Sequence, residues 1–278
     1  MSLSSVPSRL TGLYLYCLTR SANPEILAAR IPGAMAGVDE RFQVSLVRDG
    51  DLAAIVSEVD LADFSEANLQ TLAWLAPRAL RHEALVALAI GDAPVLPVKF
   101  GTIFATRSTL EAFLNLHRQT ITTALNELDG RSEWSVKGYA VEATLRELVV
   151  QRDPAIAARL GSLAAAPGLR YLQQKQLEPQ IEAAVRTWLK STLDDLHEQL
   201  AACAIGAAAL RCHASSVTGR DDQMIFNCSF LLDDSAVADF SLAVDALARR
   251  LDGSGLTFEL RGPWPPYNFC PSFADSAA

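Results

Sequence analysis

Several signals of catalysis are missing from this 278-residue sequence. Its five cysteines form no CxxC pair, and it has no Gly-rich phosphate loop, no GxSxG motif and no zinc-protease motif. The four histidines are scattered, so no acid, base and nucleophile can be assembled at a functional spacing. The sequence therefore predicts a protein that is not an enzyme and needs no metal or cofactor.

Long apolar runs are missing as well. The run at 13–18 is too short to span a bilayer and lacks a cleavage site after it, while ALVALAI at 84–90 fits an amphipathic helix. A net charge of −8 disfavours nucleic acid and anionic membranes as partners. The odd number of cysteines favours reduced thiols, so we expect a cytoplasmic protein.

The first half of the chain alternates between strand and helix signals. Residues 13–18 are almost all apolar, which predicts a central strand, and Asp49-Gly50 predicts a hairpin. Pro97 within an alternating segment predicts a strand at a sheet edge. The expected order is strand 13–18, helix 24–30, strands 42–47 and 52–59, helix 65–90 with a kink or break at Pro77, and strand 95–100. This β-α-β-β-α-β order is the ferredoxin-like pattern.

The second half repeats this order without a detectable sequence repeat. A capping box of Ser108 and Glu111 begins a connecting helix, which Gly130 ends. The elements expected after it are strand 133–141, helices 142–160 and 169–203, strands 207–214 and 223–232, a helix starting at Asp234 or Ser235, and strand 256–260. The predicted fold class is α+β, with two ferredoxin-like (βαββαβ) domains and antiparallel sheets. The predicted domains are 12–105, a connecting helix at 106–130, and 131–270.

Few side chains stand out as candidates for binding or chemistry. We interpret His82 as a packed residue, because it has no geometric partner beyond the adjacent Glu83, which points elsewhere on the helix. Lys99 lies on the outward side of the edge strand, where a lysine commonly blunts the edge and is also compatible with a functional cation. In GPWPPYNF at 262–269, stiff aromatics suit partner recognition, but we favour a strap across the core of its own domain.

Taken together, six stretches resemble the gas vesicle protein F/L family. They are LYLYCL at 13–18, VSEVDLADF at 56–64, the helix with Trp74 and His82-Glu83, VLPVKFGTIF at 95–104, PGLRYLQQK at 167–175 and GPWPPYNF at 262–269. The resemblance covers about residues 12–270, and VLPVKFGTIF and GPWPPYNF are its most specific motifs. Ala76-Pro77 departs from it, since the family is more regularly helical there, and several cysteines are peculiar to this chain.

The resemblance implies a non-enzymatic role. Family members are minor components or assembly factors of gas vesicles, which are cytoplasmic gas-filled compartments walled by a small hydrophobic shell protein. The implied partners are the major shell protein and other accessory proteins, and the implied fold has two α/β domains with ferredoxin-like features. F-type and L-type members share these motifs.

Edge strands are the expected contact surfaces, because their unpaired backbone groups can pair with a shell subunit that exposes apolar surface before assembly. The two edges are 95–100 and 42–47, and the aromatic-proline stretch adds a third candidate. The partner-contact candidates are Leu96, Val98, Lys99, Phe100, Phe42, Val44, Trp264 and Tyr267.

Two other classes of function stay open on the sequence alone. A ferredoxin-like regulatory module would bind a small ligand in a deep pocket with convergent polar groups. An enzyme would need His82, Glu83 and Lys99 in one cleft with perturbed pKa values. A shallow apolar surface would favour the assembly protein over both.

Overall fold

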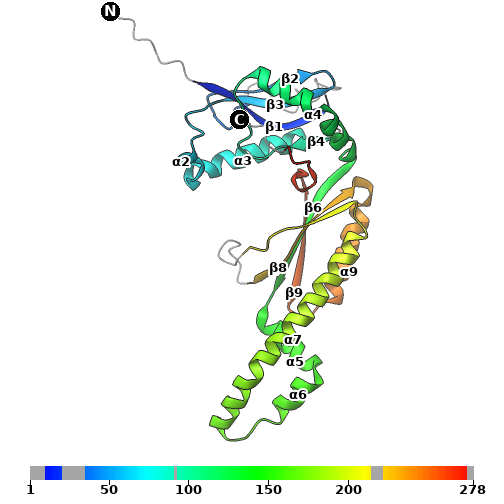
Figure 1. Cartoon of the computed structure of the whole chain (residues 1–278). Helices are drawn as coiled ribbons and strands as arrows, with labels where there is room; N and C mark the ends of the chain where they lie inside the picture. Colours follow the sequence, from blue (N-terminus) through cyan, green and yellow to red (C-terminus); the bar gives the residue numbers. More distant parts are fainter. Residues whose placement is uncertain (1–9, 21–34, 91–92, 214–221, 274–278) are drawn as a thin grey trace, which may run out of the picture. The chain divides into compact units, whose positions relative to one another are not determined.

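The computed structural model describes residues 10–20, 35–90, 93–213 and 222–273 (Figure 1). Contacts divide the chain into two compact units, which we call the first unit (up to Ser132, and again from Trp264) and the second unit (Glu133–Pro263). The chain therefore crosses between the units twice. The helix at 106–130 belongs to the first unit, because its apolar face is buried there, and the residues from Trp264 leave the second unit to which we had assigned them.

The first unit is built on a sheet with the strand order β2-β3-β1-β4, and a short fifth strand, β5, also pairs with β1. The pairings of β1 with β3, β4 and β5, and of β2 with β3, are antiparallel. The strands are β1 Thr11–Arg20, β2 Val44–Asp49, β3 Leu52–Asp60, β4 Val95–Pro97 and β5 Ile103–Phe104. Residues 14–18 of β1 have no exposed surface, which confirms the prediction of a central strand.

Both proline and glycine signals in this sheet are confirmed. Asp49 lies opposite Leu52 in the β2–β3 hairpin, and Gly50 in the turn has a φ of +62°, a conformation that favours glycine. Strand β4, which contains Pro97, lies at the end of the strand order, where a missing N–H costs no ladder hydrogen bond.

Among the described residues, the helices that accompany this sheet are α2 Glu66–Leu69, α3 Leu72–Ala89 and α4 Arg107–Glu127. Helix α3 lies along one face of the sheet and α4 along the other (Figure 1). Pro77 lies inside a continuous α3, and the break that we expected there falls at Gln70 and Thr71 instead. The helix expected at 24–30 lies outside the described residues.

The N-terminus of α4 is capped differently from our prediction. Thr106 is the N-cap, and its hydroxyl accepts from the Thr109 N–H at 3.2 Å while the Thr109 hydroxyl accepts from the Thr106 N–H at 3.1 Å. The predicted capping box of Ser108 and Glu111 is therefore wrong, because the helix begins two residues earlier than expected and Ser108 already lies in its first turn. Threonine at both positions fills the roles that the sequence pattern reserves for Ser and Glu.

The second unit has a four-stranded sheet with the order β7-β8-β6-β9. Counted along the chain, this is the same 2-3-1-4 order as in the first sheet. Helices α7 and α9 cover it with a shared core that includes Leu196, Phe230 and Phe240. The elements are β6 Arg131–Ala140, α5 Glu142–Arg152, α6 Pro154–Gly161, α7 Pro167–Ala201, β7 Gly206–Ala209, β8 Gln223–Asp233, η1 Asp234–Ala236, α9 Val237–Arg250 and β9 Leu256–Trp264.

Several boundaries in this unit differ from the sequence prediction, and the strand expected at 207–214 already ends at Ala209. The helix expected at 142–160 is two helices, because Asp153 caps α6 through the N–H groups of Ala155 and Ile156, with Pro154 in the first turn. Strand β9 continues through Pro263, although we expected regular pairing to stop at Gly262. An edge strand tolerates this proline, since its outer side needs no donor.

The α4 cap gives the first testable prediction. Replacing Thr106 with Ala removes the side-chain acceptor of the cap and is expected to lower the free energy of unfolding by about 1 kcal/mol. Ser108→Ala is the matched control and is expected to stay within about 0.5 kcal/mol of the parent. Urea denaturation measures both, and a larger loss for Ser108→Ala would reassign the cap.

Candidate functional site

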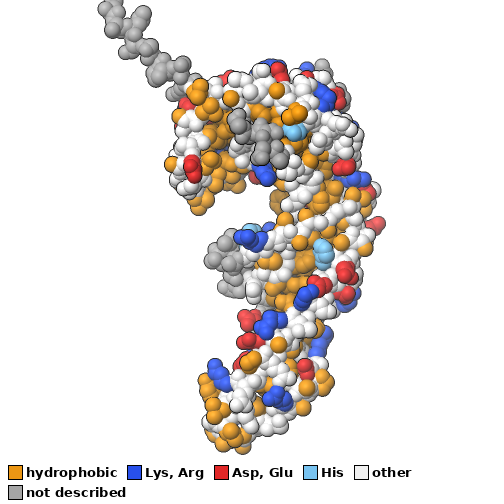
Figure 2. Space-filling model, in the orientation of Figure 1, with side chains coloured by type: hydrophobic (Ala, Val, Ile, Leu, Met, Phe, Trp, Pro, Cys, Tyr) orange, Lys and Arg blue, Asp and Glu red, His pale blue; other side chains and the backbone are white. Residues whose placement is uncertain are grey.

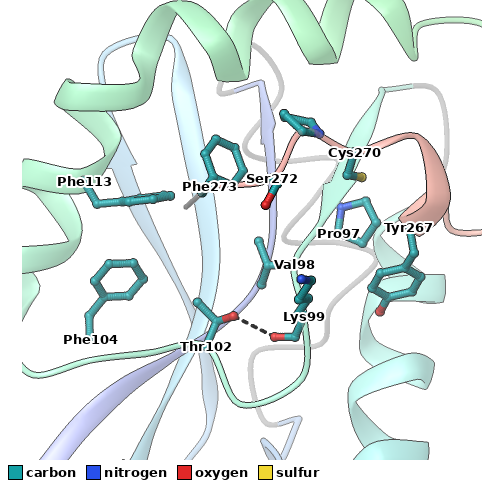
Figure 3. Close-up of a pocket in the computed structure, with 11 residues that line it drawn as sticks. Pro97, Val98, Lys99, Thr102, Phe104, Phe113, Tyr267, Cys270, Ser272 and Phe273 are labelled. Atoms are coloured by element: carbon teal, nitrogen blue, oxygen red, sulfur yellow. Dashed lines mark hydrogen bonds between the residues drawn. The ribbon is translucent and has the colours of Figure 1, made fainter. Parts of the chain in front are cut away.

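A cavity of about 310 Å³ lies in the first unit, beneath residues 264–273, which we call the C-terminal segment. Its walls come from β4 and the loop after it, from β5 and α4, and from the C-terminal segment, which includes η2 (Tyr267–Phe269). Phe104 and Phe113 lie on one side and Tyr267 and Cys270 on the other, with Val98 and Lys99 between them (Figure 3).

Aromatic rings fasten the end of the C-terminal segment to α4. The Phe273 ring lies 5.3 Å from Phe113 and 5.2 Å from His117, measured between ring centroids. Phe113 in turn lies 5.2 Å from Phe104 of β5. Such tilted and edge-to-face pairs add stabilisation beyond the area that they bury.

A chain of polar contacts fastens the start of the same segment to α3. The Tyr14 hydroxyl lies 2.9 Å from His82 Nδ1, and His82 Nε2 lies 2.9 Å from the Tyr267 hydroxyl. The Gly101 N–H donates to the Tyr14 hydroxyl oxygen at 3.0 Å. We call Gly101, Tyr14, His82 and Tyr267 the histidine network, and it joins β1, α3, the loop after β4 and the C-terminal segment.

The histidine network is uncharged near neutral pH. Burial lowers the pKa of His82 to about 4, and the His82 side chain is only 1% exposed. Burial also raises the pKa of Tyr14 and, together with Glu83, that of Tyr267. A neutral imidazole between two hydroxyls satisfies both ring nitrogens, so this arrangement suits a structural lock better than a proton acceptor.

The structure brings at least four of the resembling stretches together at His82, one of them through Tyr14 of LYLYCL. Phe100, from VLPVKFGTIF, packs its ring 5.8 Å from His82 of the α3 stretch, and Tyr267 of GPWPPYNF binds the other side of His82. The C-terminal segment therefore lies on the first unit, and our expectation that this strap crosses the core of its own domain is wrong. The partners of Tyr267 and Phe273, which are His82, Phe113 and His117, lie far earlier in the chain, where local sequence patterns give no signal.

The partner-contact candidates fall into buried and accessible groups. The side chains of Leu96, Val98 and Val44 are 0%, 7% and 7% exposed, so they cannot contact a partner in this conformation. Lys99 is exposed and Trp264 is 47% exposed. The remaining candidates, Phe42, Phe100 and Tyr267, are partly buried.

The outer edges of the first sheet also differ. The C-terminal segment shares the cavity with Pro97 and Val98, so it covers the side of the sheet where β4 lies. At the other end, residues 35–37 pair with 42–44, since Val44 N–H donates to the Met35 carbonyl and Gly37 N–H donates to the Phe42 carbonyl. No described strand lies outside the rest of β2. Of the two expected edges, β2 is therefore the more accessible to backbone pairing within the described part of the chain.

Two other groupings of reactive or charged side chains are structural in character. In the second unit, Cys228 Sγ lies 3.7 Å from His197 Nδ1, but burial raises the pKa of the Cys228 thiol to about 11, so it is not a nucleophile at neutral pH. In the first unit, Arg41 bridges the carboxylates of Asp39, Asp60 and Asp63. Burial disfavours the charge of Asp39, yet the hydrogen bonds from Arg41 prevail and leave its pKa lowered.

Sequence reasoning missed most of the cavity. Phe113, Cys270 and Phe273 were not singled out, and Phe104 entered only as the last letter of a motif. The helical spacing of the apolar residues in α4 places Phe113 on its buried face. No sequence signal indicates that Phe113 contacts Phe273, near the end of the chain. Among the described residues, no group of three or more His, Cys, Asp or Glu side chains could hold a metal ion, and no helix has the length and apolarity to cross a bilayer.

These features describe a class of protein: an α+β protein of two units, with a partly apolar cavity and an uncharged histidine network in the first unit. The family model described as "Gas vesicle synthesis protein GvpL/GvpF" matches residues 12–271, and the chain belongs to this family. The resemblance inferred from the sequence is thereby confirmed.

Relatives of known name support this assignment. The chain is 30% identical over 229 residues to gas vesicle protein L of Streptomyces sp. (strain CB03234), covering 81% of this chain and 82% of that protein. It is 26% identical to gas vesicle protein F of the same organism, covering 92% and 98%.

Solved structures share the fold. The crystal structure of the gas vesicle protein GvpF from Anabaena sp. PCC7120 matches with a TM-score of 0.66 and 19% identity, over 94% of this chain and 97% of that one. GvpF from Microcystis aeruginosa matches with a TM-score of 0.61 and 18% identity, over 93% and 98%. The arrangement of helices and antiparallel sheets is therefore the one seen in these crystal structures.

The buried histidine gives the second prediction. Because the pKa of His82 falls from 6.5 to about 4 on folding, the unfolded chain binds the proton more readily between these values. Acidification from pH 7 to pH 4.5 should therefore lower the free energy of unfolding by roughly 2–3 kcal/mol through this group. Urea denaturation at both pH values measures the loss.

The matched variants are His82→Gln and His213→Gln, which changes an exposed histidine of the second unit. His82→Gln should be less stable than the parent at pH 7. On acidification to pH 4.5, its free energy of unfolding should fall by roughly 2–3 kcal/mol less than that of the parent. His213→Gln should behave as the parent does. An unchanged pH response in His82→Gln would mean that the native histidine titrates as it does in the unfolded chain.

Proposed function

We propose that this protein is a cytoplasmic, non-enzymatic accessory protein of gas vesicle assembly that binds the major gas vesicle shell protein. Membership of the GvpL/GvpF family supports the gas vesicle role. We further propose that both units are ferredoxin-like, because their sheets repeat one strand order, and that other gas vesicle accessory proteins are further partners.

The observation that carries the shell-binding proposal is an apolar face on the outer side of α3. Leu72 is 75% exposed and Leu80 is 72% exposed, and small apolar residues occupy the positions between and after them. Hydrophobic side chains gather over the α2–α3 part of the first unit (Figure 2). We define the α3 face by its exposed apolar residues: Leu72, Ala73, Pro77, Leu80, Ala84, Ala87 and Leu88.

A surface helix normally has one apolar stripe toward the core and a polar stripe toward water. Helix α3 already has its core stripe, since Leu85, Val86 and Ala89 are buried against the sheet. Its outer stripe is apolar as well, with Glu83 as the exposed charged residue beside it. Single exposed leucines are ordinary, but a continuous apolar stripe is typical of a surface that a partner covers.

The proposed occupant is the shell protein before assembly. Such a small hydrophobic subunit presents apolar surface that favours aggregation, and the α3 face can cover that surface without forming a permanent wall. Lys99, Trp264 and the outer edge of β2 remain candidate contacts of the same partner, through side chains in the first two cases and backbone pairing in the third.

Charge placed on the α3 face tests this proposal. Leu80→Glu is expected to weaken capture of the shell protein at least about tenfold, because a carboxylate must be desolvated in the contact. Its own fold should hold, since surface substitutions typically change stability by no more than about 0.5 kcal/mol. The measurement is co-purification of the shell protein after co-expression with the tagged variant.

The matched control is Leu242→Glu, the same change at a leucine of α9 that is 62% exposed. The proposal expects Leu242→Glu to capture the shell protein as the parent does. Equal capture by a folded Leu80→Glu variant would remove the α3 face as the contact, and capture by neither the parent nor the control would contradict shell binding itself.

A further inference from the structure

We propose that the cavity beneath the C-terminal segment is a binding site for small amphiphilic carboxylates, with an aliphatic or aromatic body and one anionic head. This proposal does not rest on the α3 face, because the cavity and the α3 face share no residue. Lys99 alone occurs in both proposals, as a lining residue here and as a candidate contact of the shell protein above. It assigns a ligand class to a site formed where the end of the chain returns to the first unit.

The body of the ligand is argued from size and lining. The cavity measures about 310 Å³, at the lower end of the range of small-molecule sites. At about 30 Å³ for each water-sized group, it holds a ligand of roughly ten non-hydrogen atoms. Phe104, Phe113 and Phe273 line it together with Val98 and two prolines, and these side chains favour an apolar body. The polar side chains of the lining are those of Lys99, Thr102, Tyr267, Cys270 and Ser272.

The head of the ligand is argued from charge. Lys99 is the one lysine or arginine among the lining residues, and no Asp or Glu lies among them. Lys99 is also exposed, so its ammonium group can remain hydrated while it pairs with an anion at the mouth. In a chain of net charge −8, an apolar cavity with a lone cation at its mouth favours an anionic amphiphile over a cationic one.

The walls are held in place before any ligand arrives. Tyr267 is bound to His82 at 2.9 Å, Phe273 packs on α4, and the Thr102 hydroxyl donates to the Lys99 carbonyl at 2.7 Å (Figure 3). Cys270 Sγ lies 3.0 Å from the Pro266 carbonyl oxygen. A preformed cavity needs little reorganisation on binding, which favours even a small ligand.

Octanoate is a suitable probe, since it has ten non-hydrogen atoms, and octylammonium is its cationic counterpart. Titration of the full chain by ligand-observed NMR is expected to give a dissociation constant for octanoate of about 1 mM. Octylammonium should bind at least about threefold more weakly, because Lys99 opposes it. Equal binding of the two probes would overturn the anionic class.

Cys270 localises the binding, because its thiol lines the cavity. Its alkylation by iodoacetamide, followed by mass spectrometry, should slow at least about threefold at saturating octanoate. Cys203 is exposed and lies in the second unit, so its alkylation serves as the internal reference and should not change. Equal slowing at both cysteines, or at neither, would contradict a site at this cavity.

Two variants with matched controls complete the test. Lys99→Gln is expected to weaken octanoate binding about three- to fivefold, as for one exposed ion pair, and Lys190→Gln should not change it. Cys270→Phe fills the cavity and should abolish binding, whereas Cys203→Phe should not. Unchanged thermal unfolding establishes that Cys270→Phe is folded. Octanoate binding that persists in a folded Cys270→Phe variant, or that falls equally in both lysine variants, would overturn the proposal.

Discussion

The return of the C-terminal segment to the first unit is the constraint on which the rest of the structure depends. Tyr267 closes the histidine network from one side, and Tyr14 and the Gly101 N–H close it from the other. A buried imidazole that loses the Tyr267 hydroxyl loses one of its hydrogen-bond partners, which include the Val98 backbone, and such a loss costs about 1 kcal/mol. The first unit therefore needs residues that the chain supplies only after the second unit is complete, and the two units cannot be separated by a single cut.

The same return explains how the first sheet manages its edges. An uncovered edge strand invites pairing with other chains, and β4 is protected by Pro97, by Lys99 and by the C-terminal segment beside it. Among the described residues, the surfaces that remain accessible are of another kind: the outer edge of β2 beyond Val44 and the apolar α3 face. The proposed contact with a hydrophobic subunit and the protection of the β4 edge therefore fall on different sides of one unit.

The sequence predicted the local features of this fold. The central strand β1, the turn at Gly50 and the edge position of β4 follow from hydrophobic pattern, positive φ and a missing N–H, all of which act over a few residues. The capping box of α4 was misplaced by two residues because Ser108 and Glu111 fit the pattern as well as Thr106 and Thr109 do. The break at Asp153 was missed although Asp followed by Pro is a local signal for the start of a helix. The course of β9 through Pro263 was missed because it depends on the position of β9 at the edge of its sheet.

The candidate site was less accessible to sequence reasoning. His82 was correctly interpreted as packed, and Lys99 was singled out. Nothing in the sequence indicated that Tyr267 binds His82 and lines a cavity together with Lys99. Contacts between residues about 185 positions apart have no local signature in the sequence. The family resemblance therefore identified the stretches involved, but it did not predict that they contact one another.

Hydrogen exchange at the Gly101 amide tests the return of the C-terminal segment most directly. This amide donates to the Tyr14 hydroxyl, which is linked to Tyr267 through His82. Protection of the Gly101 amide from exchange therefore reports whether the whole histidine network is formed. The account predicts slow exchange of Gly101 in the parent chain and much faster exchange in a folded Tyr267→Ala variant, with the amides of β2 unaffected. Equal protection of Gly101 in both proteins would contradict the dependence of the first unit on the end of the chain.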